Sequence, residues 1–249
     1  TVVQVAPQRV PEIIEAVGQT EGSKDVEVRA RVSGILEKTL YREGERIKAG
    51  APLFQIDRAP FENALAQATA SLAQAKASLV QERARQEQVQ REAVRLKQLV
   101  EQRAISQREY DDATTALKTE EALIAGAEAR VLDAEARLRD AELNLSYTGI
   151  AAPIGGISGR ALRSNGSLVT AGADSALLTT ISQSDPIWVR FSVAESEYAQ
   201  VRVAKKPEVR LVLEDGSTFA GVGRLNFAAS AVDPRLGTVQ LRAEFGNAA

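Results

Sequence analysis

Three residue types are absent from the sequence, which contains no cysteine, no histidine and no methionine. A structural zinc site, a thiol nucleophile and a Ser-His-Asp triad therefore cannot be built from this chain. Soft-metal handling through sulfur or imidazole is excluded for the same reason. The absence of cysteine fits the cytoplasm and an export compartment equally, so it does not set the location.

Aromatic residues and net charge are also low. Aromatics make up 4% of the chain and the formal net charge is −2, so no nucleic-acid partner is expected. There is no apolar run of about 18 residues, and the sequence therefore predicts no membrane span. The first residue is Thr1, which is compatible with the removal of a signal peptide or an anchor. At 249 residues, the chain has room for two or three domains.

Apolar residues recur every seven positions between about Phe61 and Leu145. This pattern predicts an antiparallel coiled-coil hairpin over residues 59–145. Two helices of about forty residues give a rod roughly 60 Å long. The heptad rows are Leu65, Leu72, Leu79, Gln86, Ala93 and Val100 with Ala68, Ala75, Glu82, Val89 and Leu96, and then Tyr110, Leu117, Ile124, Val131, Leu138 and Leu145 with Ala113, Glu120, Ala127, Ala134 and Ala141.

The turn of the hairpin is expected near residues 101–105. Ser106 and Glu109 have the spacing of a capping box for the second helix. The polar residues in the heptad rows are Glu82, Gln86 and Glu120. Folding about a turn near residue 103 brings Gln86 level with Glu120. We therefore expect a weakened polar layer midway along the hairpin, either a flexible point or a contact to a neighbouring copy.

A glycine and apolar pattern repeats on the two sides of the hairpin, shifted by 122 residues. It predicts two half-sandwiches, 26–58 and 146–183, each unstable alone and packed face to face. The hairpin is then an insertion between them, with its two ends close together. The repeated positions are Gly34, Ile35, Leu40, Gly44, Ile47 and Gly50, matched by Gly156, Ile157, Leu162, Gly166, Val169 and Gly172.

The remaining segments predict a small β-barrel. Strand-like alternation at 187–193, 209–213, 219–227 and 239–245 is separated by Asp215-Gly216 and Asp233-Pro234. Residues 1–25 have too few apolar residues for a core of their own, so we expect them to complete the barrel with 184–249. The predicted fold class is α+β and multidomain, with a helical hairpin inserted in a lipoyl-like or biotinyl-like β-sandwich and a small, incomplete β-barrel.

No catalytic or cofactor site emerges from the motifs. The glycine-rich stretch 155–160 lacks the Gly-Lys-Ser/Thr of a phosphate loop. The β unit around Asp57-Arg58-Ala59 resembles biotinyl and lipoyl carrier domains, which present a modified lysine on a turn. Arg58 stands at the lysine position and cannot be acylated in the same way. The carrier fold is therefore expected without the carrier chemistry, and we expect no enzyme activity, no cofactor and no metal.

The whole plan resembles the periplasmic adaptor, or membrane fusion protein, family of RND multidrug efflux pumps, of the AcrA/MexA type in the HlyD-like superfamily. The resemblance spans nearly the entire chain. It is carried by Val32-Ser33-Gly34-Ile35-Leu36, Asn144-Leu145-Ser146-Tyr147-Thr148, Ser184-Asp185-Pro186-Ile187-Trp188-Val189 and Gly237-Thr238-Val239-Gln240-Leu241. It implies a subunit that bridges an inner-membrane RND transporter to a TolC-like outer-membrane channel. Copies would assemble as a ring, a hexamer or a trimer of dimers, in the periplasm.

The same resemblance implies a binding site at the hairpin tip. The family carries an arginine there, a leucine four residues later and a serine seven residues after that, and these fall on Arg95, Leu99 and Ser106. Leu99 also lies outside both heptad rows, which makes it a candidate contact by itself. The family's membrane-proximal domain and lipidated cysteine are missing from this sequence, so we expect the inner-membrane attachment to lie in a lipid or N-terminal segment outside it.

Two other functions stay open from the sequence. An adaptor of an ABC-type exporter, for macrolides or type I secretion, would share the hairpin and the lipoyl-like domain. The stretches at 185–189 and 237–239 favour the RND type. A biotinyl or lipoyl carrier protein is the third hypothesis, and the absence of any biotinyl or lipoyl adduct in the intact mass would remove it.

Overall fold

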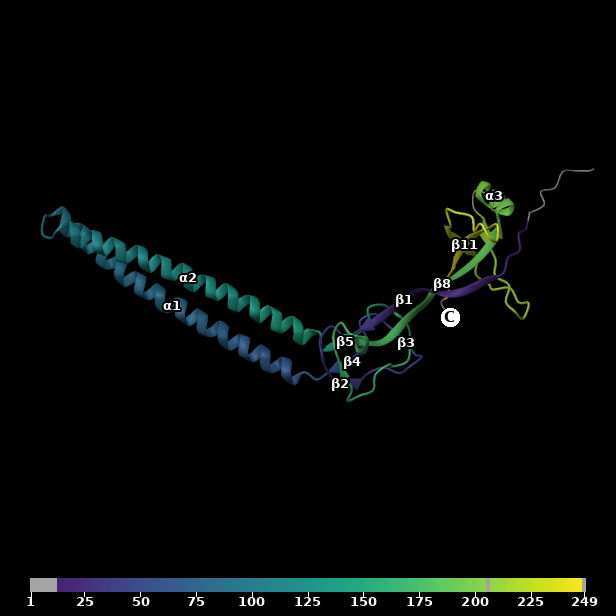
Figure 1. The fold of residues 1–249 in the computed structure, drawn as a ribbon, viewed down its shortest axis with the longest axis horizontal. Helices are drawn as coiled ribbons and strands as arrows, with labels where there is room; N and C mark the ends of the chain where they lie inside the picture. The colour runs from purple at the N-terminus through teal and green to yellow at the C-terminus, as the bar shows by residue number, and fades with distance from the viewer. Residues whose placement is uncertain (1–12, 205–206, 248–249) are drawn as a thin grey trace, which may run out of the picture.

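The computed structural model describes residues 13–204 and 207–247, and the part of the strand prediction on residues 1–12 lies outside them. Figure 1 shows an elongated molecule with a pair of long helices at one end and two β regions toward the other. The elements are β1 (Gly18–Arg29), β2 (Gly34–Thr39), β3 (Arg46–Ile47), β4 (Pro52–Ile56), α1 (Ala59–Glu101), α2 (Gln107–Ser146), β5 (Gly149–Ala151), β6 (Gly156–Ser158), β7 (Leu168–Val169), the 3-10 helix η1 (Asp174–Ala176), β8 (Leu177–Ala194), α3 (Glu195–Val203), β9 (Glu208–Val209), β10 (Gly223–Ala228) and β11 (Thr238–Phe245).

The helix pair follows the predicted rows of sevens. α1 has 43 residues and α2 has 40, and the two run side by side and antiparallel (Figure 1). Every residue of the heptad rows is buried or half-buried, whereas most residues between them are exposed. Small side chains lie deepest, with Ala127 only 2% exposed, because alanine lets two helices approach closely. No helix among the described residues is both long and apolar enough to cross a bilayer.

The β-sandwich mixes strands from before and after the helices. β2 and β4 pair with β7 and β5 in a four-stranded sheet, and β3 pairs with β6 in the other sheet. The expectation of two separate halves packed face to face is therefore wrong, since each sheet contains strands of both. A half on its own would leave unpaired strand edges, and the exchange gives those backbone groups partners.

The internal repeat itself is confirmed by the pairing register. Gly34 pairs with Val169, and Gly156 pairs with Ile47. The two pairs are equivalent under the repeat. The shift of 122 residues relates Gly34 to Gly156 and Ile47 to Val169. The sandwich is therefore pseudo-symmetric, with each half donating the same two strands to the other.

Glycines of the repeat have the same backbone conformation in both halves. Gly44 and Gly166 have φ of 78° and 87°, and Gly50 and Gly172 have φ of 80° and 79°. This left-handed region is open to glycine at little cost and disfavoured for residues with a Cβ. The repeated glycine spacing therefore reflects two tight turns that occur in each half of the sandwich.

Four of the six repeated apolar positions lie largely outside the sandwich core. Ile35, Leu40, Ile157 and Leu162 are 50%, 48%, 41% and 36% exposed. Leu36, which is outside the repeated set, is fully buried, and Val169 is the repeated position that is fully buried as well. The sandwich core consists of Val28, Ala30, Val32, Leu36, Leu53, Phe54, Ile56, Ile150, Ala152, Val169, Ala176, Leu178 and Ile181.

One long strand pair connects the sandwich to the second β region. β1 and β8 pair antiparallel from Gly18↔Phe191 to Arg29↔Leu177. β8 also pairs with β6 of the sandwich and with β11 of the second region. The domain boundaries expected at 25/26 and 183/184 fall inside these strands, so a continuous two-stranded ribbon joins the two β regions (Figure 1).

Candidate functional site at the hairpin tip

The turn between α1 and α2 is closed by a defined set of backbone hydrogen bonds. The Arg103 N–H donates to the Val100 carbonyl and the Ala104 N–H donates to the Leu99 carbonyl, both at 2.9 Å. This is the Schellman pattern, which requires a left-handed residue just after the helix. Arg103 is that residue, with φ of 59°, and no other non-glycine residue in the described part has positive φ. The conformation costs a residue with a Cβ about 1 kcal/mol.

The start of α2 is capped as the sequence predicts. The Glu109 carboxylate accepts from the Ser106 N–H and from its hydroxyl, each at 2.9 Å. The Ser106 Oγ accepts from the Glu109 N–H at 3.4 Å. The bonds from the Ser106 N–H and hydroxyl lower the pKa of Glu109. Both sides of the turn are thus held by hydrogen bonds.

The structure places the three sequence-predicted site residues on the two sides of this turn. Arg95 lies on α1 with its side chain 66% exposed and pairs with Glu92. Leu99 is half-buried in the last turn of α1. Ser106 is exposed and is the residue that caps α2. The arrangement offers one apolar side chain and one guanidinium at the end of a rod. Their role in binding stays a prediction.

Ser106→Ala is expected to destabilise the start of α2 by about 1 kcal/mol, because the capping oxygen is lost. Ser106→Asn is the matched control, since asparagine caps equally well. Glu109 contributes stability above its unfolded pKa, and this is lost as the pH falls through its lowered folded pKa. Ser106→Ala should therefore reduce the loss of helical circular dichroism on acidification. An unchanged stability of the helical signal at neutral pH in this variant would contradict the capping role.

The predicted polar layer contains a buried carboxylate. Glu120 is 6% exposed, and Arg85 Nε lies 3.0 Å from its Oε1. Its other oxygen and one oxygen of Glu82 are buried without a hydrogen-bond partner among the described residues. The residue that binds Glu120 is therefore Arg85, whose side chain is 65% exposed. Gln86, which the sequence placed level with Glu120, is half-buried.

Glu120→Leu is expected to stabilise the hairpin by about 1–3 kcal/mol. A buried ion pair is often no better than a packed apolar residue, and Arg85 can return to water. Arg85→Ala should act in the opposite direction, since it leaves the carboxylate buried without its cation. Urea denaturation followed by helical circular dichroism measures both changes. A loss of stability in Glu120→Leu would show that the ion pair is a net stabilising contact.

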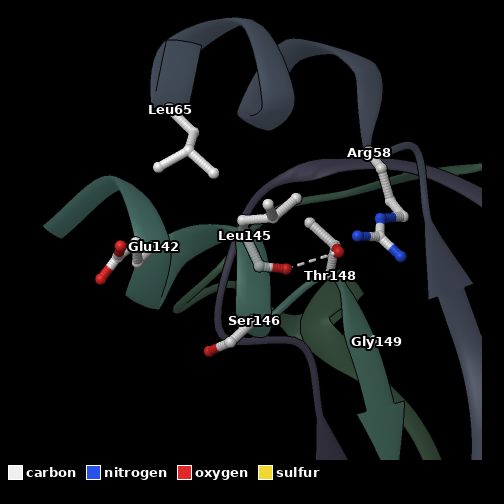
Figure 2. Close-up of a pocket in the computed structure, with 7 residues that line it drawn as sticks. All are labelled: Arg58, Leu65, Glu142, Leu145, Ser146, Thr148 and Gly149. Atoms are coloured by element: carbon white, nitrogen blue, oxygen red, sulfur yellow. Dashed lines mark hydrogen bonds between the residues drawn. The ribbon is translucent and has the colours of Figure 1, made fainter. Parts of the chain in front are cut away.

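A second concave site lies where the helices meet the sandwich. Figure 2 shows Leu65, near the start of α1, and Leu145, near the end of α2, among the residues that line it. The Thr148 hydroxyl, which is buried, donates to the Leu145 carbonyl at 2.7 Å. Arg58, on the rim, pairs with Glu62 at 3.1 Å. The Thr148 hydroxyl and the Arg58 guanidinium are thus both engaged in local contacts at the helix ends.

Sequence reasoning missed Arg103. The segment Gln102-Arg103-Ala104 contains no glycine or asparagine, so it carries no signal for a left-handed residue. The sequence offered one indirect signal, which was the short distance between the two predicted helices. A five-residue connection between antiparallel helices requires a tight turn.

Comparisons with known proteins match the whole of this architecture. The model of the "RND MFP, barrel-sandwich hybrid domain" matches residues 24–181, and that of the "RND MFPs, beta-barrel domain" matches 186–249. The antibiotic efflux pump periplasmic linker protein ArpA of Pseudomonas putida is 38% identical over 99% of this chain and 62% of its own length. The membrane fusion protein MtrC of Neisseria gonorrhoeae is 38% identical over 99% of this chain and 58% of its own length.

A solved structure supports the same fold. MacA from Actinobacillus actinomycetemcomitans superposes with a TM-score of 0.78 at 25% identity, over 93% of this chain and 71% of that one. The chain thus spans about 60% of the length of the curated relatives, 62% of ArpA and 58% of MtrC.

Proposed function

The chain belongs to the RND membrane fusion protein family, and on this premise we propose that it is the periplasmic adaptor of a tripartite efflux pump. It bridges an inner-membrane RND transporter to a TolC-like outer-membrane channel and serves the export of small molecules. The role is assembly, without catalysis or a cofactor. The relatives that support it are named as linkers of antibiotic, solvent and multidrug efflux pumps.

One observation carries the proposal. The long helix pair uses its apolar rows on itself and ends in a turn that is held by hydrogen bonds and faces away from the β regions (Figure 1). Such a rod contributes little to the core of the β regions, because its apolar rows pack against each other within the hairpin. Its length separates the tip from the sandwich, which is the geometry required of a bridge between two membranes' proteins.

The parts of the chain take separate roles in this proposal. Residues 59–145 form a coiled coil whose tip binds the channel through Arg95, Leu99 and Ser106. Residues 26–58 with 146–183 form the lipoyl-like domain, which stacks in a ring of copies, a hexamer or a trimer of dimers. Residues 1–25 with 184–249 form the barrel that faces the transporter. Attachment to the inner membrane belongs to a lipid or N-terminal segment outside this sequence.

Affinity purification of the full-length protein from its own membranes tests the proposal. We expect an RND transporter and a TolC-like channel to co-purify. Recovery of an ABC transporter subunit in place of the RND transporter would assign the protein to an ABC-type exporter. The bridging role would be contradicted if, after crosslinking of the membranes, the purified protein were recovered with neither an RND nor an ABC transporter.

A further inference from the structure

Arg103 lies at the left-handed position of the turn, where the backbone conformation favours glycine or asparagine. Its φ of 59° lies in the left-handed region, which glycine and asparagine adopt most readily. The hydrogen bonds from the N–H groups of Arg103 and Ala104 need only this backbone geometry. They use nothing of the arginine side chain. The conformation of the turn therefore does not explain why an arginine is present.

The Arg103 side chain is exposed at the end of the rod. Nearby, Arg95 is paired with Glu92, whereas Arg103 forms no ion pair within the part of the chain that the structure describes. Glu101 and Arg108 flank the turn with opposite charges, so the apex carries no broad positive patch. Arg103 is the exposed cation that lies within the turn itself, between the end of α1 and the start of α2.

Residues that break a local conformational rule concentrate where a protein binds a partner. A guanidinium offers five N–H donors in a fixed fork that matches a carboxylate. The turn's hydrogen bonds hold the backbone of Arg103, and the bond from Ala104 to Leu99 ties it to the predicted contact residue. We infer that Arg103 is a specificity-determining contact that binds a carboxylate on the outer-membrane channel, beside Leu99. This inference rests on the proposed function, since it requires the tip to face the channel.

Arg103→Gly separates binding from conformation, because the two effects have opposite signs. The melting temperature of the helical signal should rise by about 2–4 °C, since the left-handed strain is relieved. The affinity of the full-length protein for the purified TolC-like channel of the same organism should fall about tenfold, because a charge-assisted contact is lost. Its dependence on salt should become weaker. Arg103→Asn should behave in the same way.

Lys118→Ala is the matched control, since it removes one exposed positive charge from α2 away from the apex. It should leave the affinity within about twofold of the unmodified protein. Wild-type affinity in Arg103→Gly, or a fall in both affinity and melting temperature, would overturn the inference. Failure of the proposed function looks different, because the unmodified protein would then not bind the channel at all.

Discussion

Leu99→Asp is expected to abolish docking to the outer-membrane channel and to restore drug sensitivity in cells that depend on the pump. Leu99 is half-buried in the last turn of α1, outside the heptad rows. An aspartate there would bring an unpaired carboxylate into an apolar contact, and burial of such a charge costs several kcal/mol. A loss of affinity of at least about 100-fold follows from this cost. Channel binding by the purified protein and growth in the presence of the drug measure the two effects.

Leu132→Asp is the matched control for this prediction. Leu132 lies midway along α2 and is 66% exposed, so the same substitution is made at an exposed leucine away from the tip. It should leave binding unchanged, and both variants should keep the helical circular dichroism of the parent. Normal drug resistance in a correctly folded Leu99→Asp variant would show that the tip is not the channel-binding site. Loss of binding in Leu132→Asp would place the contact on the side of the rod.

Gly156→Ala is expected to destabilise the sandwich by about 3 kcal/mol. A Cβ at this position would lie 2.5 Å from the Ser182 carbonyl oxygen and 2.9 Å from its carbon. These are backbone atoms of β8, which pairs with the neighbouring Ile157, so the clash cannot be relieved by a side-chain rotation. Overpacking of this kind costs 1–3 kcal/mol or more. A fall in melting temperature of about 10 °C is expected.

Two other glycines make this prediction specific. Gly34 is the repeat partner of Gly156, but its added Cβ would meet the Ile56 Cγ2 at 2.6 Å. Ile56 is β-branched and fully buried, so this methyl can shift only slightly and Gly34→Ala should also destabilise the sandwich. Gly126 in α2 has no atom within 4 Å of an added Cβ, and Gly126→Ala should stabilise the helix by roughly 0.5–1 kcal/mol. Equal effects at all three positions would contradict the packing argument.

The sequence predicted the features that depend on local periodicity. Heptad spacing located both helices, and the Ser106 capping box located the start of α2, because these patterns are set by residues three to seven positions apart. The repeated glycines located the tight turns for the same reason. The strand expected at 239–245 was also found, as β11, within one residue of its predicted start.

The features that were missed depend on long-range pairing. The exchange of strands between the two halves could not be read from the sequence, because β2 carries the same pattern whichever strand it pairs with. The same holds for Glu120, whose partner Arg85 depends on the rotation of one helix against the other. The left-handed Arg103 was hidden because an exposed arginine ordinarily signals only a solvated charge.

The most direct test of the account is photo-crosslinking from position 99 of the full-length protein in cells. A photoreactive side chain in place of Leu99 should crosslink to a TolC-like outer-membrane channel, and the same group in place of Leu132 should not. This result is expected if the rod meets the channel end-on through its tip. Crosslinks to the channel from position 132 and none from position 99 would contradict it.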